Sequence, residues 1–310
     1  MDEKGFVEGV RRYMSQLREE KRYSSAKSYQ DALNSFIKYS GTENISYSDI
    51  NKANLHRYEA YLLEKGCMCN TVSTYMRRIR CVYNKAIEDG DAEYIPGLFQ
   101  GVFTGVESKR KKSLSLENQH KLMTVKVESE VLRETQLVVC LLFQYAGMSF
   151  VDFAHLKERN IKNGILDYNR QKTGTLMRLE ILDTAELMRK ELMGDKRPAS
   201  GYLFPFLSGT KTGYEAYLEY NAALSRFNRN LKALKKAAGI ASDVTSYTIR
   251  HSFAMALKEQ NVPIEMISEL LGHKSIKTTQ IYLKGFGLKE RTEVNKMNLS
   301  YVKNYSMEAL

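Results

Sequence analysis

Apolar residues recur at intervals of three and four along most of this 310-residue chain. That spacing places them on one face of an α-helix, so it predicts a series of amphipathic helices. Only four prolines occur in the whole chain, which leaves most of the periodic segments uninterrupted. One stretch, residues 161–182, departs from the helical pattern. We therefore expect a mainly α-helical protein with one small β-structure in its second half.

The first hundred residues predict four helices. The first covers residues 6–17, and the second follows a serine pair at 24–25. The third begins near Asn51 and stops at Gly66, whereas the fourth has Asn70 as its N-cap and ends at Gly90. These helices predict a separate helical domain at the N-terminus.

The second part of the chain mixes helices with a strand pair. Helical patterns cover 115–124, 130–146, 149–157, 213–238 and the segment between Pro263 and Gly272. The segments 164–170 and 176–181 are strand-like, and the turn between them has Gly174 at its tip. This pattern predicts a small antiparallel sheet within a mostly helical domain.

Charge is concentrated in the second part. Residues 1–105 hold 15 Lys and Arg against 14 Asp and Glu, whereas residues 106–310 hold 32 against 22. A local basic excess favours a polyanionic partner, with nucleic acid first and an acidic membrane surface second. Four consecutive cations at 109–112 indicate a basic linker at 106–113. It would join a helical domain of residues 1–105 to a domain of residues 114–310.

Other classes are disfavoured by composition. The longest apolar run, residues 137–143, is far shorter than the ~20 residues that cross a bilayer, and tryptophan is absent. The N-terminus has no apolar signal core, so we expect a cytoplasmic protein, which would be nucleoid-associated if its polyanionic partner is DNA. Four cysteines without a CxxC pair predict neither a disulfide scaffold nor a structural zinc site.

The last third contains the residues that carry chemistry. Arg250 and His251 lie in TIRHSFA, and His273 and Tyr282 lie in LLGHKSIKTTQIY. A tyrosine hydroxyl, with a pKa of ~10, is a poor nucleophile unless nearby cations favour its phenolate. Arginine and histidine around a phosphate would provide such cations and would stabilise the transition state. Taken singly, each of these side chains is more often structural.

The motifs ELLGHKSIKTTQIY and IRHSFA strongly resemble the signature of the tyrosine recombinase (phage integrase) family. The resemblance implies a helical core-binding, SAM-like DNA-binding domain followed by a mostly α catalytic domain with a small antiparallel β-sheet. It also implies site-specific recombination, in which duplex DNA is cut and rejoined through a 3′-phosphotyrosyl intermediate. The phosphodiester energy would be kept in the protein–DNA bond, so the family requires no cofactor, metal or ATP.

The resemblance also implies a role for individual residues, because positions of this chain match functional positions of the family. Tyr282 matches the nucleophile, Arg250 the second arginine that holds the phosphate oxygens, and His273 the residue that steadies the phosphate. Lys172, in the turn between the predicted strands, matches the lysine that protonates the 5′-oxygen leaving group. His251 matches a position that is often histidine, and we expect it to be structural.

Two positions depart from the family pattern. Ser149 stands where the first catalytic arginine is expected, and Tyr247 stands where a histidine is usual. Ser149 also has a structural interpretation, because Asp152 three residues later makes it resemble a capping-box N-cap. The loss of one cation is compatible either with a branch of active recombinases that share this substitution or with a catalytically impaired DNA-binding protein.

Arg170 is the candidate replacement for the missing cation. It lies two residues before Lys172, so on an extended strand both side chains would point to the same face. A DNA-backbone contact or a solvated position is an equally weighted alternative for Arg170.

The family also predicts partners. We expect double-stranded DNA, a homotetramer on two recombination sites, and room for accessory DNA-bending proteins. The tail after about residue 288 would contact a neighbouring protomer. Two domains without an extra arm-binding domain favour inversion or resolution of a DNA segment, with integration as the alternative.

Overall fold

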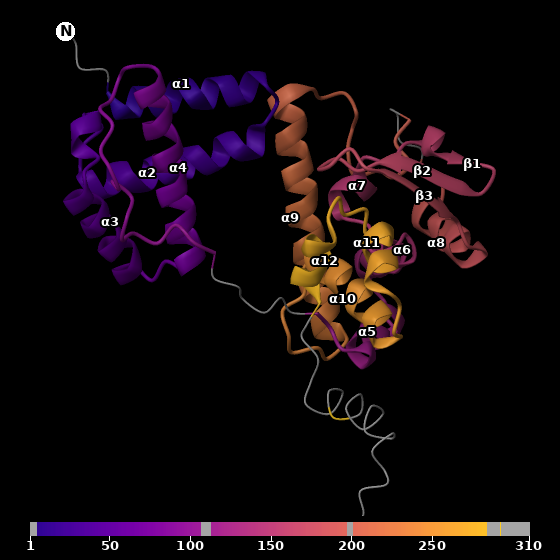
Figure 1. Ribbon diagram of the computed structural model, residues 1–310. Coiled ribbons are helices and arrows are strands. Elements are labelled where there is room, and N and C mark those ends of the chain that lie inside the picture. The colour runs from indigo at the N-terminus through magenta and orange to yellow at the C-terminus, as the bar shows by residue number, and fades with distance from the viewer. Residues whose placement is uncertain (1–4, 107–112, 197–200, 284–291, 293–310) are drawn as a thin grey trace, which may run out of the picture. The chain divides into compact units, whose positions relative to one another are not determined.

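The computed structural model describes residues 5–106, 113–196, 201–283 and Thr292, and the side chains of Ile281 and Tyr282 lie outside this description. The chain divides into two compact units, one of residues 1–109 and 212–218 and the other of residues 110–211 and 219–310. Both are built mainly from helices (Figure 1), and a three-stranded antiparallel sheet lies in the second. This confirms the predicted fold class. Most of the predicted linker, 107–112, and the tail beyond Thr292 lie outside the described residues.

The first unit contains the four α-helices that the periodicity predicts. They are α1 (Phe6–Glu19), α2 (Tyr23–Ser40), α3 (Lys52–Glu64) and α4 (Cys69–Glu88), with a short 3-10 helix at Tyr47–Asp49. The ring of Phe36 meets those of Phe6 and Tyr58 edge to face, at centroid distances of 6.0 and 4.8 Å. All three rings are almost fully buried, so they form the centre of this unit's core.

The helix starts of the first unit differ in one respect from the prediction. Asn51 caps α3, and its side chain accepts a hydrogen bond from the Asn54 backbone N–H at 3.0 Å. The prediction that Asn70 caps α4 is wrong, because the helix begins at Cys69 and its N-cap is Met68. The Met68 carbonyl accepts backbone N–H bonds of the first turn, so the backbone starts the helix without a side-chain cap.

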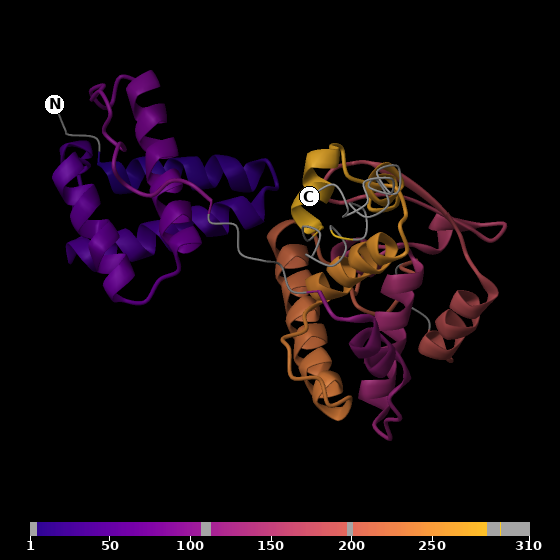
Figure 2. The ribbon, with the colours of Figure 1, turned by 60° about the horizontal axis from the view of Figure 1, so that its bottom comes forward.

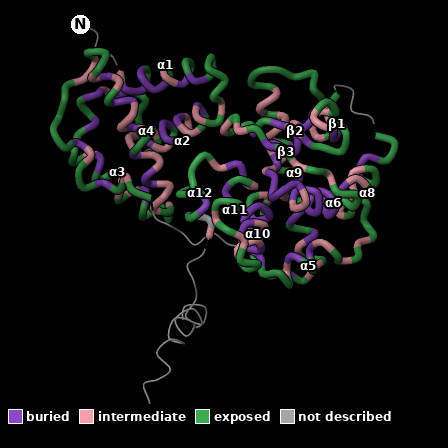
Figure 3. Tube along the Cα trace, turned by 45° about the vertical axis from the view of Figure 1, so that its right-hand side comes forward, coloured by how far each residue is buried: buried purple, intermediate pink, exposed green. Residues whose placement is uncertain are grey.

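Eight α-helices of the described residues belong to the second unit, although the first residues of α9 are grouped with the first unit. They are α5 (Leu116–Thr124), α6 (Glu130–Gln144), α7 (Phe150–Ala154), α8 (Asp183–Met193), α9 (Gly213–Ala237), α10 (Ser246–Glu259), α11 (Ile264–Leu270) and α12 (Ile276–Tyr282). A 3-10 helix at Glu158–Asn160 leads into the sheet. Buried and exposed stretches alternate along these helices (Figure 3), as expected for amphipathic segments that share a core.

Helix α6 is at the centre of the second unit. Val139, Leu141 and Leu142 have no exposed surface. Helices α5, α8 and α10 all pack against α6 (Figure 2), which explains why its second half is apolar on every face. Within the part of the chain that the structure describes, no helix is both long and apolar enough to cross a membrane.

The sheet follows the strand order β1 (Ile161–Lys162), β2 (Ile165–Asn169) and β3 (Leu176–Glu180). Leu166 pairs with Leu179 and Tyr168 with Met177 in the β2–β3 register. Strand β2 ends at Asn169, and Arg170 already belongs to the tight turn that leads to β3. Its carbonyl accepts from the Gly174 N–H at 2.8 Å, and its N–H donates to the Thr175 carbonyl at 2.9 Å.

Candidate active site

A reciprocal cap determines where α10 begins. Thr245 is the N-cap; its hydroxyl accepts a hydrogen bond from the Thr248 N–H at 3.3 Å, and its own N–H donates to Thr248 Oγ1 at 3.1 Å. These bonds satisfy backbone donors that the helix itself leaves without partners. With this start, Arg250 and His251 fall on the second turn and are each only 3% exposed.

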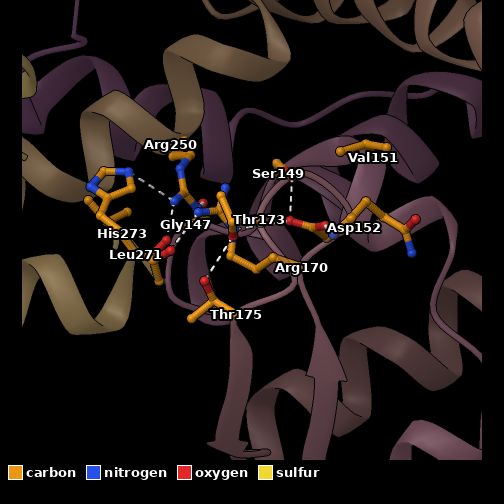
Figure 4. Close-up of polar contacts among 12 residues, drawn as sticks. Gly147, Ser149, Val151, Asp152, Arg170, Thr173, Thr175, Arg250, Leu271 and His273 are labelled. Atoms are coloured by element: carbon orange, nitrogen blue, oxygen red, sulfur yellow. Dashed lines mark hydrogen bonds and ion pairs between the residues drawn. The ribbon is translucent and has the colours of Figure 1, made fainter. Parts of the chain in front are cut away.

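The Arg250 guanidinium joins two distant segments of the chain. Its Nη1 donates to the carbonyl oxygen of Gly147 at 2.8 Å, and its Nη2 donates to the carbonyl oxygen of Leu271 (Figure 4). Gly147 has a φ of +64°, and a Cβ there would lie 2.8 Å from the Phe253 ring. Glycine at this position therefore lets the end of α6 approach α10 closely enough for Arg250 to reach its carbonyl.

His273 follows the end of α11 and is half-buried. Its backbone N–H donates to the Ser268 carbonyl at 2.9 Å, which anchors the loop to the helix. The ring uses both nitrogens: Nε2 lies 3.4 Å from Arg250 Nη2, and Nδ1 lies 2.9 Å from Thr279 Oγ1 on α12. The structure thus brings together Arg250 and His273, which the sequence predicts for one site.

Arg170 enters the same cluster from the strand turn. It is only 7% exposed, and its Nη1 donates to the carbonyl oxygen of Gly272 at 2.8 Å. Gly272 has a φ of +59°, and a Cβ on it would lie 2.4 Å from Met177 Sδ and 2.7 Å from Arg170 Cδ. The absence of a side chain at Gly272 is therefore what lets the Arg170 side chain pass beside the loop that carries His273.

Asp152 connects the turn to the start of α7. Its Oδ2 accepts a hydrogen bond from Ser149 Oγ at 2.6 Å and lies 3.6 Å from Arg170 Nε, while its Oδ1 accepts from the Gln171 N–H at 2.7 Å (Figure 4). The Asp152 side chain is 1% exposed. A buried carboxylate is stable only when charges and donors surround it, and this one has both.

The predicted capping role of Ser149 is only partly right. Ser149 occupies the N-cap position of α7, but its side chain makes no capping hydrogen bond. The hydroxyl donates to the Asp152 carboxylate instead, because a charged acceptor forms a stronger hydrogen bond than a backbone group.

The prediction that Arg170 and Lys172 share one face is wrong. It assumed an extended strand through both residues, but β2 ends at Asn169 and residues 171–173 form a turn. The side-chain alternation of a strand stops there, so Arg170 is buried while Lys172 is exposed.

Of the two remaining predicted residues, Tyr247 lies near this cluster, whereas the side chain of Tyr282 is not among those that the structure describes. Tyr247 is 49% exposed, and its ring packs edge to face on that of buried His251, with 4.8 Å between centroids. Tyr282 is the last residue of α12, one helical turn after Thr279, and its side chain lies outside the described residues.

Electrostatically, the cluster gathers cations near the buried tyrosine of β2. Arg170 and Arg250 lie close to Tyr168 of β2. Burial raises the pKa of the Tyr168 hydroxyl and Asp152 raises it further, whereas the two arginines oppose the shift. Tyr168 therefore stays neutral at physiological pH, and the site keeps an excess of positive charge.

The guanidiniums of Arg170 and Arg250 bind the backbone carbonyls of residues 272 and 271, and the imidazole of the next residue, His273, lies beside Arg250. Guanidinium groups match the planar pairs of oxygens on a phosphate, so this arrangement suits a phosphodiester. Among the residues that the structure describes, no group of three or more His, Cys, Asp or Glu side chains is placed to hold a metal ion.

Sequence reasoning missed two contributors. Asp152 was expected only as a cap partner, whereas it connects Ser149, Arg170 and the strand turn. Thr279 carries no catalytic signature, although its position one helical turn before Tyr282 could have marked it as a neighbour of the site.

This helical fold, with arginines gathered beside a small sheet, is that of DNA recombinases of the integrase type. Residues 112–286 match the phage integrase family, and residues 5–96 match the phage integrase SAM-like domain. The chain therefore belongs to the phage integrase family of site-specific DNA recombinases.

Individual relatives are similar over most of the chain. Tyrosine recombinase XerD of Listeria innocua serovar 6a is 25% identical over 295 residues, which cover 90% of this chain and 91% of the relative. Tyrosine recombinase XerA of Pyrococcus furiosus is 31% identical over 192 residues, or 61% of this chain and 62% of XerA.

Solved structures share the fold at lower identity. A lambda integrase dimer bound to a COC′ core site aligns with a TM-score of 0.66 and 15% identity, covering 91% of this chain and 79% of the integrase chain. The Tn1549 transposon integrase in complex with a circular intermediate DNA aligns with a TM-score of 0.67 and 12% identity, covering 94% of this chain and 99% of that one.

Proposed function

We propose that this protein is an active tyrosine recombinase that cuts and rejoins duplex DNA through a covalent 3′-phosphotyrosyl intermediate. The observation that supports this most is the convergence of Arg250 and His273. Arg250 comes from α10 and His273 from the loop after α11, and the two side chains meet at 3.4 Å although they lie apart in the sequence. Both match the family's phosphate-binding residues, and α12 ends at Tyr282 close by in the chain.

The reaction assigns one role to each residue. The hydroxyl oxygen of Tyr282 loses its proton to water, attacks the phosphorus and forms a P–O bond, while the bond to the 5′-oxygen breaks. Lys172 delivers a proton to that leaving oxygen, and its exposure in the turn leaves it accessible to DNA. Arg250 and His273 stabilise the charge that develops on the non-bridging oxygens. One phosphodiester replaces another, so the step needs no added energy.

We assign this chain to a branch of the family in which the first catalytic arginine is replaced. Ser149 stands at that position, and its hydroxyl donates to Asp152. Arg170 lies on the other side of the same carboxylate oxygen, with its Nε 3.6 Å away. Because Arg170 reaches the loop beside His273, it is placed to supply the second guanidinium.

A catalytically impaired DNA-binding protein is the competing function, and a trapping experiment separates the two. The protein is incubated with a duplex that carries a nick near the cleavage site, so that religation is prevented and covalent adduct accumulates. Wild type should form the adduct, and Tyr282→Phe should bind the same DNA without forming it. Tyr94→Phe, which alters a 74% exposed tyrosine of the first unit, is the matched control. Adduct formation by Tyr282→Phe would show that another residue is the nucleophile.

The domain division that we propose is a core-binding DNA-binding domain of residues 1–105, a basic linker of residues 106–113 and a catalytic domain of residues 114–310. Support comes from the two family matches, which end at residue 96 and resume at residue 112. Both domains would contact DNA, and the linker's four cations would lie along phosphates.

Assembly is expected to involve four protomers on two double-stranded sites. A lambda integrase tetramer bound to a Holliday junction shares this fold with a TM-score of 0.66. A gel-shift titration on a DNA with two half-sites should show cooperative binding, and cross-linking of paired sites should yield a tetramer. Non-cooperative binding would contradict this assembly. Inversion, resolution or integration of a DNA segment, in the cytoplasm and with accessory DNA-bending proteins, would be the biological setting.

A further inference from the structure

Thr279 holds the imidazole of His273 from the helix that ends at Tyr282. Its Oγ1 lies 2.9 Å from His273 Nδ1, and the residue has no exposed surface. The contact therefore forms inside the protein, away from solvent that would compete for the ring nitrogen. Thr279 also lies one turn before Tyr282 in α12, so the contact links the His273 ring to that helix.

The opposite ring nitrogen faces a group that can only donate. His273 Nε2 lies 3.4 Å from Arg250 Nη2, and a guanidinium has no acceptor. In a neutral imidazole Nε2 is then the acceptor, and the proton resides on Nδ1. That proton points at Thr279 Oγ1, which accepts the hydrogen bond.

A bound phosphodiester requires His273 Nε2 to donate a hydrogen bond, whereas in the free protein this nitrogen accepts one. Phosphate oxygens accept hydrogen bonds, so His273 contributes to the site only when Nε2 carries a proton. In the neutral ring, Nδ1 then becomes an acceptor and needs a donor in the same place. A hydroxyl can fill both roles because it rotates, whereas a carbonyl or a carboxylate would fix the Nδ1–H form.

We propose that Thr279 is a positioning residue that allows His273 to exchange tautomers when the phosphodiester enters the site. This inference rests on the proposed function, which supplies the phosphate. The threonine hydroxyl accepts from Nδ1–H in the free protein and donates to Nδ1 in the DNA complex. The ring keeps its orientation throughout, and it stays attached to α12.

Three variants isolate the hydroxyl. Thr279→Val keeps the shape and removes the hydroxyl, whereas Thr279→Ser restores it. Thr278→Val is the matched control, because Thr278 is the exposed neighbour on the same helix. Thermal unfolding and half-site binding are measured for all of them, so that a loss of folding is recognised separately.

The first readout is the rate of adduct formation on the nicked duplex at saturating DNA. Thr279→Val should be slower by roughly tenfold to a hundredfold, as expected when a hydrogen bond to a catalytic group is lost. Thr279→Ser should recover most of the rate, and Thr278→Val should match wild type. A wild-type rate for Thr279→Val, or an equal loss in Thr279→Ser, would overturn the proposal.

The second readout is the ¹⁵N spectrum of histidine-labelled protein, with the His273 signals assigned from a His273→Gln variant. In wild type and Thr279→Ser, the proton should be on Nδ1 without DNA and on Nε2 with an uncut half-site. Nε2 protonated before DNA is added, or both nitrogens protonated afterwards, would overturn the proposal. If wild type forms no adduct, the proposed function fails, and the spectra still decide whether the tautomer changes.

Discussion

Arg170 and Arg250 donate hydrogen bonds to the carbonyl oxygens of two consecutive residues, Gly272 and Leu271. The two guanidiniums thereby hold the loop in front of His273 from different directions, one from the strand turn and one from α10. Two buried cations repel each other, so the carbonyls and the Asp152 carboxylate must offset that cost. The result is a preformed positive site whose geometry depends on both arginines.

Replacing Arg170 by alanine should slow strand cleavage by about 10²–10³, the usual effect of losing a transition-state donor. Half-site binding should fall much less, because many other phosphate contacts remain. Adduct formation on the nicked duplex measures the first quantity and gel shift the second. Arg178→Ala is the control, because Arg178 is an exposed arginine of the adjacent strand. Cleavage at the wild-type rate by Arg170→Ala would remove Arg170 from the reaction.

Introducing Ser149→Arg into the Arg170→Ala protein should recover part of the lost cleavage rate. Positions 149 and 170 contact the same oxygen of Asp152, at 2.6 and 3.6 Å, so a guanidinium from either side reaches the same carboxylate. Ser149→Ala alone should raise the activation free energy of cleavage by about 1 kcal/mol or less, the value of one hydrogen bond. No recovery in the double variant would indicate that the two positions serve different groups.

Asp152→Asn should lower the free energy of unfolding by about 3 kcal/mol, because it leaves the buried Arg170 without its counter-charge. The amide keeps one acceptor for the Gln171 N–H, but its NH2 group would then replace the oxygen that faces Arg170 Nε, and Ser149 Oγ would have to accept instead of donate. Urea denaturation measures the change. Asp167→Asn removes the carboxylate of an exposed ion pair with Arg178 and should have little effect. Equal stability of the two variants would show that Asp152 is not needed to hold the turn.

Gly272→Ala should both destabilise the second unit and slow cleavage. The new Cβ would lie 2.4 Å from Met177 Sδ and 2.7 Å from Arg170 Cδ, which displaces the arginine from the loop. Gly174→Ala is the matched control, since its φ of +66° is similar but nothing lies within 4 Å of its Cβ. Gly174→Ala should lower the free energy of unfolding only by the backbone strain of ~1–2 kcal/mol. The difference in the free energy of unfolding between the two variants measures the steric cost of a Cβ at position 272. Equal values would contradict such a cost.

Much of the architecture could be predicted from local patterns. The helical spacing of apolar residues, the strand pair around Gly174 and the glycine at the end of α6 are properties of short segments, which depend on neighbours along the chain. The order of the two C-terminal motifs was likewise enough to indicate the family. Local rules failed at Asn70, where the backbone of Met68 starts the helix without a side-chain cap.

What only the tertiary structure decided is how the side chains of the site are used. From the sequence, Ser149 and Asp152 form a capping box, and Arg170 shares a face with Lys172. In the structure the Asp152 carboxylate binds the strand turn and faces Arg170, whose guanidinium reaches the Gly272 carbonyl. Periodicity indicates which face of a segment is buried, but it does not indicate which donors and acceptors meet there. Those pairings depend on distant segments packing together, because each buried charge must find its partner in three dimensions.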